Sequence, residues 1–269
     1  MQNGLPIFQV DAFTSKLFFG NPAAVVPLEE WLPDQVLQSI ASENNLSETA
    51  FLQPSSEKDV DYDIRWFTPT QEVDLCGHAT LASAFVVFNF LGSKEKTVRL
   101  YSKFSGHSEV SKADDMLIIN FPNREAVDIP RPTGLEEALG VTVKSFLKAA
   151  KNMAVLENAA AVRSAQPDLD YIANLPGDGL ILTAAGDDSD CDCVSRYFAP
   201  HAGIPEDPVT GSAHCTIVPY WAKQLNKEHI HARQVSQRGG ELFCQLAGDR
   251  VFIKGAAVLY MQGTIHIFI

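Results

Sequence analysis

One short stretch in the first half of the chain concentrates residue types that can do chemistry. The segment "DLCGHATLASA" (74–84) places Cys76, Gly77 and His78 at the head of an apolar run. A thiol beside an imidazole can serve as a nucleophile with its base, as an acid–base pair or as two ligands of a metal. The same residues can also do no more than begin a helix, so the rest of the chain has to decide between these interpretations.

The second half of the chain repeats this pattern. The segment "DPVTGSAHCTI" (207–217) places Thr210, Gly211 and Ser212 at the head of a second apolar run. A helix start leaves backbone N–H groups unpaired and carries partial positive charge, and glycine lets a ligand approach the backbone. Although one copy would indicate only a helix start, two copies favour a paired site for a carboxylate or phosphate. Since Ser212 corresponds to His78, we expect these polar groups to face each other across that site.

Two acidic residues have no counterpart in the other half and are therefore candidates for acid–base chemistry. Glu48 lies in "NNLSETAFL" (44–52), between an expected helix end and an apolar strand, where partial desolvation suits a proton carrier. Asp207 lies four residues before Gly211 and is followed by Pro208, and it could hold a substrate amino group or relay a proton. The simpler interpretations are a capping or solvated glutamate and an Asx-type turn residue.

Cys76 and Asn21 are further candidates. A thiol at a helix N-terminus is stabilised as the thiolate, so Cys76 could act as a base or nucleophile. A two-thiol racemase needs a partner cysteine, however, and Thr210 stands at the corresponding position. Asn21 lies in the turn "GNPAAVV" (20–26), where it either contacts a ligand or only shapes the turn.

The two glycine motifs belong to a longer internal repeat, which indicates the elements that hold them. "RWFTP" (65–69) recurs as "RYFAP" (196–200) 131 residues later, and the glycine motifs are 134 residues apart. Downstream, "YSKFSG" (101–106) corresponds to "VSQRGG" (235–240) at the same offset of 134. Several matches in one order and at nearly one offset favour a duplication over the general strand–helix rhythm of α/β chains.

Each half is expected to form the same α+β domain. The pattern predicts a strand, a helix begun by Pro and Asp, further strands, the glycine motif with its long apolar helix, and a strand hairpin. A helix that is apolar all round is buried, so each mostly antiparallel sheet should curl around one central helix. We place the domains at 1–124 and 125–269, at the proline-rich stretch "FPNREAVDIPRP" (121–132), and allow the last strand to cross back to the first domain. The expected ligand site is the cleft between them.

Composition narrows the partners and the location. The 269 residues carry a formal net charge of −12, which argues against nucleic acid or an anionic membrane but allows a small anionic metabolite as partner. Five cysteines without framework spacing fit a reducing cytosol, and Cys76-x-His78 and Cys191-x-Cys193 lack the matched second pairs of a metal site. We expect no signal peptide, membrane span or nucleotide-binding loop. The chain is therefore predicted to be cytoplasmic and to use neither a metal nor a cofactor.

Taken together, the motifs resemble a known family. In order and over nearly the whole chain, the PhzF-like (phenazine-biosynthesis-like) family is matched by "VDAFTSKLFFGNPAAVV" (10–26), "NLSETAFL" (45–52), "DLCGHATLASA" (74–84), "EDPVTGSAH" (206–214) and "RGGELFCQLAGDRVFIKGAA" (238–257). The resemblance implies the diaminopimelate epimerase fold, with two pseudo-symmetric domains. It also implies a homodimer and a cofactor-independent isomerase.

The resemblance further implies roles for single residues. It assigns proton transfer on an unsaturated, carboxylate-bearing substrate to Glu48, with help from His78, Asp207 and Ser212. Diaminopimelate epimerases carry a cysteine in each motif, so that reaction is not expected here. Two rival interpretations remain: an amino-acid racemase that uses Cys76 and a second base, and a metabolite-binding protein without catalysis. The predicted site thus comprises Glu48, His78, Asp207, Ser212 and Cys76 for catalysis, with Asn21, Gly77, Thr210 and Gly211 for binding.

Overall fold

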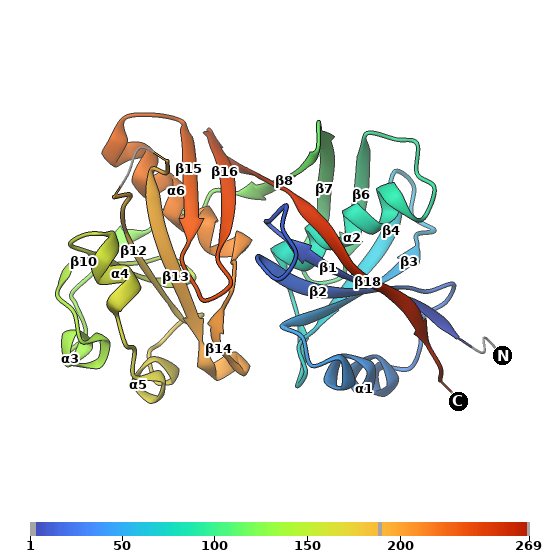
Figure 1. Ribbon diagram of the computed structural model, residues 1–269, viewed down its shortest axis with the longest axis horizontal. Helices are drawn as coiled ribbons and strands as arrows, with labels where there is room; N and C mark the ends of the chain where they lie inside the picture. The colour runs from blue at the N-terminus through green and yellow to red at the C-terminus, as the bar shows by residue number, and fades with distance from the viewer. Residues whose placement is uncertain (1–3, 188–189, 268–269) are drawn as a thin grey trace. The chain divides into compact units, whose positions relative to one another are not determined.

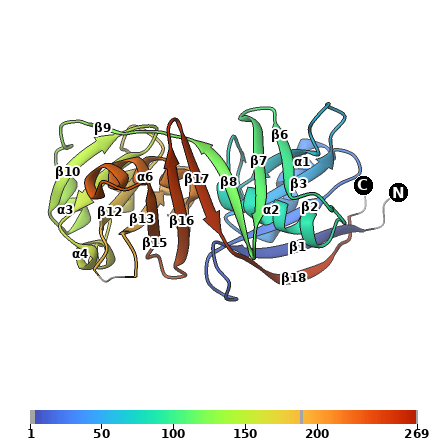
Figure 2. The ribbon, with the colours of Figure 1, turned by 90° about the horizontal axis from the view of Figure 1, so that it is seen from above.

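Strands dominate the structure, with a few helices set against them. The computed structural model describes residues 4–187 and 190–267 (Figures 1 and 2). Its internal contacts divide the chain into two compact units, Met1–Asn120 with Lys254–Ile269, and Phe121–Ile253. The prediction from the sequence placed the boundary after residue 124.

The first unit follows the element order expected for one repeat. The chain passes through β1 (Leu5–Ala12), β2 (Asn21–Pro27), α1 (Asp34–Asn44), β3 (Glu48–Pro54), β4 (Tyr62–Phe67), β5 (Glu72–Val73), α2 (Gly77–Asn89), β6 (Thr97–Ser102) and β7 (Gly106–Ala113), and β18 (Ala257–Ile265) completes the unit. Strand β8 (Met116–Pro122) leads across the boundary into the second unit. The last strand, β18, runs antiparallel beside β1 (dark red and blue in Figure 1).

The second unit carries the other repeat. Its elements are β9 (Val127–Asp128), α3 (Leu135–Leu139), β10 (Val143–Lys148), β11 (Asn152–Leu156), α4 (Ala159–Ser164), α5 (Leu169–Ala173), β12 (Leu180–Ala185), β13 (Cys193–Ala199), the 3₁₀ turn η1 (Pro200–Ala202), β14 (Ile204–Asp207), α6 (Gly211–Leu225), β15 (His229–Gln234) and β16 (Gly240–Ala247). Strand β17 (Arg250–Gly255) leads back across the boundary to β18.

Strand pairing is the same in both units. In the first unit, β1 and β2 are antiparallel, β2 and β3 parallel, β3 and β4 antiparallel, β4 and β6 parallel, and β6 and β7 antiparallel. In the second unit the same sequence of directions joins β10, β11, β12, β13, β15 and β16. The two-fold repeat of one α+β domain, predicted from the sequence, is therefore confirmed.

A pair of arginines shows that the repeat extends to side chains. Arg65 on β4 donates from Nε and Nη2 to both carboxylate oxygens of Glu72, at 2.7 and 2.8 Å. Arg196 on β13 holds Glu206 in the same way, at 2.7 and 2.9 Å. Each guanidinium also lies about 5 Å from the ring of the phenylalanine two residues later, at 5.1 and 4.9 Å. These bidentate pairs tie β4 to β5 and β13 to β14, the segments that lead into the glycine motifs.

The two long helices occupy the predicted central positions. Helix α2 contacts strands β1, β2, β3, β7 and β18, and helix α6 contacts β12, β15 and β16 (Figure 2). Eleven of the 13 residues of α2 are buried, as its all-round apolar sequence requires. Helix α1 differs because it buries only one face, with Leu37, Ile40 and Ala41, against the outer side of the first sheet. The glycine motifs thus open helices that are held by strands on several sides.

Candidate active site

Three elements of the first unit converge on the first glycine motif. Asn21 is the first residue of β2, Glu48 is the first residue of β3, and His78 lies in the first turn of α2. The parallel pairing of β2 with β3, which sets Ala23 opposite Glu48, brings the first two side chains to the same end of the sheet. Residues that are 27 and 30 positions apart in the sequence therefore meet at the start of α2.

A glycine fixes the entry of β2 into this site. Gly20 has a φ of +68°, and a Cβ there would lie 2.2 Å from the carbonyl oxygen of Ala12. Only glycine fits this turn without displacing the backbone of β1. The following residue, Asn21, is fully buried. Shaping the turn is thus the role of Gly20, which leaves the side chain of Asn21 available for contacts.

His78 is held between an amide and a carboxylate. Asn21 Nδ2 lies 3.0 Å from His78 Nδ1, and His78 Nε2 lies 3.1 Å from Glu48 Oε2. An amide nitrogen can only donate, so Nδ1 accepts and the proton of the neutral ring is on Nε2, facing Glu48. The 3.1 Å contact sets this N–H beside Glu48 Oε2, although Oε2 accepts no well-directed hydrogen bond among the described residues. Asn21 therefore orients the ring toward the carboxylate.

Burial gives this pair its chemical character. The exposed fraction is 8% for Glu48 and 3% for His78. A carboxylate in such a place is poorly hydrated, and the imidazole Nε2 faces it at 3.1 Å. Moving a proton between Glu48 and a carbon acid or His78 costs little reorganisation of solvent there. The arrangement therefore suits general acid–base chemistry.

Cys76 also lies beside this ring. Its Sγ is 3.5 Å from His78 Nδ1 and 3.9 Å from Nε2. The residue is the N-cap of α2 but makes no side-chain capping bond, so its thiol is directed to the histidine rather than to the helix. The structure thus brings Cys76 into the same cluster as Glu48.

The cluster also contains the ligand types of a zinc site. The relevant atoms of Glu48, Cys76 and His78 all lie within 4.8 Å of one another. Carboxylate, thiolate and imidazole at bond lengths of about 2.0–2.3 Å from a shared ion would lie about 3–4 Å apart, so modest shifts would let them share one. The sequence offered only the Cys76–His78 pair, because the third ligand comes from β3. The expected absence of a metal stays a prediction.

The second glycine motif is organised around Asp207, the last residue of β14. Thr210 Oγ1 donates to Asp207 Oδ2 at 2.5 Å, which orients the carboxylate. Both residues are buried, with exposed fractions of 6% and 5%. This side-chain bond is compatible with the simpler interpretation of Asp207 as an Asx-type turn residue, so that interpretation stays open. Thr210, which corresponds to Cys76, acts here as a positioning residue.

Gln234 supports this loop and was missed in the sequence. It is the last residue of β15 and is 1% exposed. Its Oε1 accepts from the backbone N–H of Thr210 at 2.8 Å, and its Nε2 donates to the backbone carbonyl of Asp207 at 2.6 Å. The signal in the sequence is weak, because a single glutamine after a strand has no distinctive neighbours.

Ser212 and Gly211 follow Asp207 and Thr210 in the second motif but take no part in their hydrogen bonds. Both lie in the first turn of α6, and the side chain of Ser212 is partly exposed. Its hydroxyl makes no hydrogen bond within the described part of the chain. Binding of an anion by the backbone around Gly77 and Gly211, and an approach of Ser212 to His78, stay predictions.

The helix starts repeat one further contact. Thr80 Oγ1 donates to the carbonyl of Cys76 at 2.5 Å, and His214 Nδ1 lies 2.8 Å from the carbonyl of Thr210. Since a carbonyl only accepts, Nδ1 of His214 carries the proton. Burial lowers the pKa of His214 to about 4, so the ring is neutral near pH 7.

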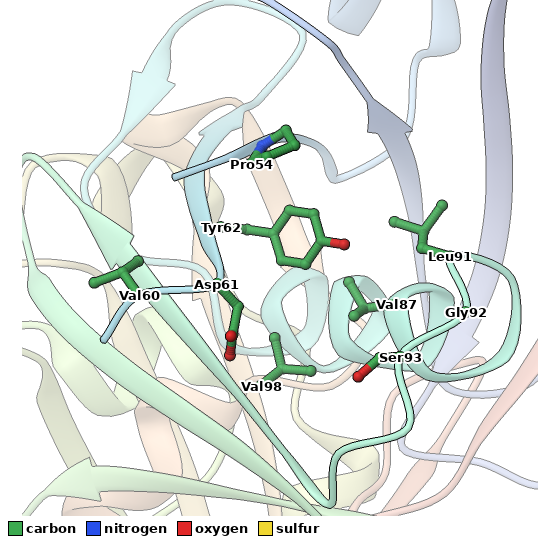
Figure 3. Close-up of a pocket in the computed structure, with 9 residues that line it drawn as sticks. All are labelled: Pro54, Val60, Asp61, Tyr62, Val87, Leu91, Gly92, Ser93 and Val98. Atoms are coloured by element: carbon green, nitrogen blue, oxygen red, sulfur yellow. The ribbon is translucent and has the colours of Figure 1, made fainter. Parts of the chain in front are cut away.

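A separate hollow of about 380 Å³ lies elsewhere on the first unit (Figure 3). Residues of β3, β4, α2, β6 and their flanking loops line it, and Figure 3 shows the ring of Tyr62 among them. Burial, followed by the charge of Asp61, raises the pKa of the Tyr62 hydroxyl. None of the predicted site residues is among its lining residues.

Comparison with known proteins identifies the family. A family model described as phenazine biosynthesis-like protein matches residues 10–263. The chain belongs to this family. The family resemblance and the diaminopimelate epimerase-like fold predicted from the sequence are therefore confirmed.

Relatives within this phenazine biosynthesis-like family match along their whole length. An uncharacterized isomerase of Pseudomonas aeruginosa is 47% identical over 264 residues, which cover 98% of this chain and 99% of the relative. A crystal structure of a PhzF family protein from Enterococcus faecalis has a TM-score of 0.93 at 44% identity, covering 98% of this chain and 100% of the other.

More distant structures share only the fold with this chain. A hydroxyproline epimerase from Agrobacterium vitis has a TM-score of 0.63 at 11% identity and covers 99% of this chain and 93% of its own.

Among the described residues, no helix is long and apolar enough to cross a membrane.

Proposed function

We propose that this chain is a cofactor-independent isomerase that moves a proton on a small carboxylate-bearing substrate, either amino-acid-like or cyclic. One observation carries the proposal: the buried row Asn21–His78–Glu48, with contacts of 3.0 and 3.1 Å. Membership in a family whose relatives include named isomerases supports the reaction class. The particular substrate and the proton path belong to the proposal.

Glu48 is the proposed proton carrier. As a carboxylate it takes a proton from a carbon next to an unsaturated group, and the electron pair of the broken C–H bond enters the π system of the substrate. The same carboxyl group then returns the proton to a different carbon of that system. Atoms and electrons balance without an oxidant, so no redox cofactor takes part.

His78 is the proposed partner of this carboxylate. Because Asn21 fixes the ring with its Nε2 proton toward Glu48, the imidazole stabilises the carboxylate before the proton is taken up. It also gives Glu48 a second group with which a proton can be shared. Asn21 acts through the ring and is a positioning residue.

The second motif supplies the proposed remaining parts. Asp207, oriented by Thr210, holds a polar group of the substrate or relays a proton. Ser212 is proposed to donate to the substrate, because its hydroxyl has no hydrogen bond among the described residues. The backbone N–H groups at Gly77 and Gly211 are proposed to bind the carboxylate and the developing negative charge.

Exchange of hydrogen for deuterium tests the proton transfer directly. The protein is incubated in D₂O with panels of amino acids and anthranilate-like acids, and deuterium at carbon is followed by NMR and mass spectrometry. We expect exchange with at least one acid, slowed about 100-fold or more by Glu48→Gln, since general acid–base groups contribute factors of this size. Glu43→Gln, at an exposed glutamate of α1, is the matched control and should exchange at the unmodified rate.

The racemase interpretation has its own support in the 3.5 Å contact between Cys76 Sγ and His78 Nδ1. The racemase also needs a second base, and the thiol of Cys215 in the second motif is poorly suited to this role. Burial raises the pKa of Cys215 to about 12, and its Sγ faces the carbonyl of Gly211 at 3.9 Å. Exchange that survives Glu48→Gln but is lost in Cys76→Ala would replace our proposal with this one. Binding of acids without any exchange would favour a metabolite-binding protein.

The remaining expectations from the sequence accompany this proposal. On composition and the family resemblance, we propose a small anionic metabolite as partner and no nucleic-acid or membrane partner. A homodimer and a place in the cytoplasm belong to the same proposal.

A further inference from the structure

An unused cation stands beside the second glycine motif. Lys151 lies in the turn between β10 and β11, and its Nζ is 4.9 Å from the ring centroid of Tyr197. Its side chain is partly buried. Among the residues that the structure describes, the ammonium makes no hydrogen bond and no ion pair, although it has three N–H groups to donate.

The backbone around Lys151 is held firmly. The backbone N–H of Ala149 donates to the carbonyl of Lys151 at 3.0 Å, which closes the turn. The next residue, Asn152, is buried, and its side chain donates to the carbonyls of Pro176 and Gly179, both at 3.1 Å. The fold therefore fixes the turn that carries Lys151, and its partly buried side chain packs on Tyr197.

Lys151 and Asp207 lie near the same residues of the second unit. Tyr197, under the ammonium, is the register partner of Asp207 across β13 and β14. Burial has the largest effect on Lys151 and lowers its pKa. The negative charges of Asp178 and Asp207 act in the opposite direction, and the positive charge of Arg124 adds to the lowering. The Cys215 thiol in the first turns of α6 is close enough to contribute as well. Lys151 thus lies at the same end of the second unit as the predicted site residues.

The internal repeat shows that the side chain of Lys151 has no counterpart in the first unit. Asn152 begins β11 as Asn21 begins β2, and the offset of 131 residues is that of the two arginines on β4 and β13. In the first unit this turn is where a side chain reaches the site, since Asn21 contacts His78. The residue before Asn21 is Gly20, which has no side chain, whereas the residue before Asn152 is Lys151.

We infer that Lys151 joins the backbone N–H groups of the glycine motifs in binding the carboxylate of the substrate, and that it is a specificity-determining residue for acids over neutral analogues. The inference rests on the proposed function, because it assumes a carboxylate-bearing ligand at the second motif. A partly desolvated ammonium without an acceptor gains from an anionic partner, since a charge-assisted hydrogen bond returns the hydration that burial removed. A lysine that only packs on Tyr197 would gain nothing from an acid.

Amine labelling tests this inference without any turnover. The intact protein is acetylated with a limiting amount of a sulfonated succinimidyl acetate, and each lysine is followed by peptide mass spectrometry. Because burial lowers the pKa of Lys151, its labelling should extend to lower pH than is usual for lysine. Anthranilate should slow the labelling of Lys151, whereas 2-aminobenzamide, which lacks the charge, should not. Lys148, at the end of β10, should be insensitive to both.

Binding measurements on variants complete the test. Lys151→Met should weaken anthranilate binding about tenfold to a hundredfold and leave 2-aminobenzamide binding unchanged. Lys151→Arg should retain most of the affinity, and Lys148→Met should have no effect. The inference is overturned when neither anthranilate nor any acid that shows deuterium exchange protects Lys151, or when Lys151→Met binds these acids as tightly as the unmodified protein. A protected Lys151 in a protein that shows no Glu48-dependent exchange would instead refute the isomerase proposal and leave the acid site intact.

Discussion

Replacing Gln234 should loosen the loop that carries Asp207. In Gln234→Leu the side-chain volume is nearly kept, but the backbone N–H of Thr210 and the backbone carbonyl of Asp207 lose partners at 2.8 and 2.6 Å. Both groups belong to buried residues. A buried polar group left without a partner costs about 1–3 kcal/mol, so for these two groups we expect a loss of about 2–6 kcal/mol in the free energy of unfolding.

Thermal and urea unfolding measure this loss. For units of this size, 1 kcal/mol corresponds to about 3 °C, so Tm should fall by about 6–18 °C. Deuterium exchange should also slow, because Asp207 loses its fixed position. Gln224→Leu, at an exposed position of α6, is the control for adding an apolar side chain. If Gln234→Leu lowers Tm no more than Gln224→Leu does, the loop is held by other contacts and our reasoning is wrong.

A second variant separates the two hydrogen bonds of Gln234. Gln234→Glu keeps an oxygen for the N–H of Thr210 but replaces the amide donor with a carboxylate that faces the carbonyl of Asp207. It should be destabilised near pH 7 and recover part of the loss in acid, where the protonated carboxyl group can donate. Equal stability at both pH values would show that the donor to Asp207 contributes little.

Two further predictions concern protons and metals. Burial lowers the pKa of His214 from 6.5 to about 4. Between pH 6.5 and pH 4 the unfolded chain therefore binds a proton that the folded chain does not, so the free energy of unfolding falls as the pH falls, by about 3 kcal/mol in total. Denaturant unfolding at pH 7 and pH 4 should show this loss, and His214→Leu should show correspondingly less; an equal loss in both proteins would contradict the assignment. Added Zn²⁺ should stop deuterium exchange by occupying Glu48, Cys76 and His78, a chelator should restore it, and Cys76→Ser should weaken the inhibition. Inhibition that is unchanged in Cys76→Ser would place the ion elsewhere.

Parts of the fold follow from patterns that are local in the sequence. The all-round apolar runs after Gly77 and Gly211 predict buried helices, because no face of such a helix can be left in water. The recurrence of "RWFTP" as "RYFAP" predicts a second copy of one unit, and Arg65 and Arg196 do make the same bidentate contacts. The return of β18 to β1 has no such signal, because strand partners far apart in the chain leave no periodic trace.

The residues of the candidate site also divide into those that the sequence indicates and those that only the structure reveals. Glu48, His78 and Asp207 can be chosen from the sequence because acids and an imidazole stand out where the two halves differ. Gln234 and Lys151 cannot, since they are ordinary residues at a strand end and in a turn. Asn21 can be named as a possible ligand contact, but its pairing with His78 cannot be predicted. Their importance comes from the parallel pairing of β2 with β3 and from the turns that precede β2 and β11.

The sequence by itself thus determined the family, the repeat, the two buried helices and the residues able to carry a proton. Only the tertiary structure decided which atoms meet: the amide of Asn21 with one nitrogen of His78, and the carboxylate of Glu48 with the other. The physical reason is that a side chain's chemistry is a property of its type, whereas its partner is set by strand register and burial. Those depend on segments tens of residues away.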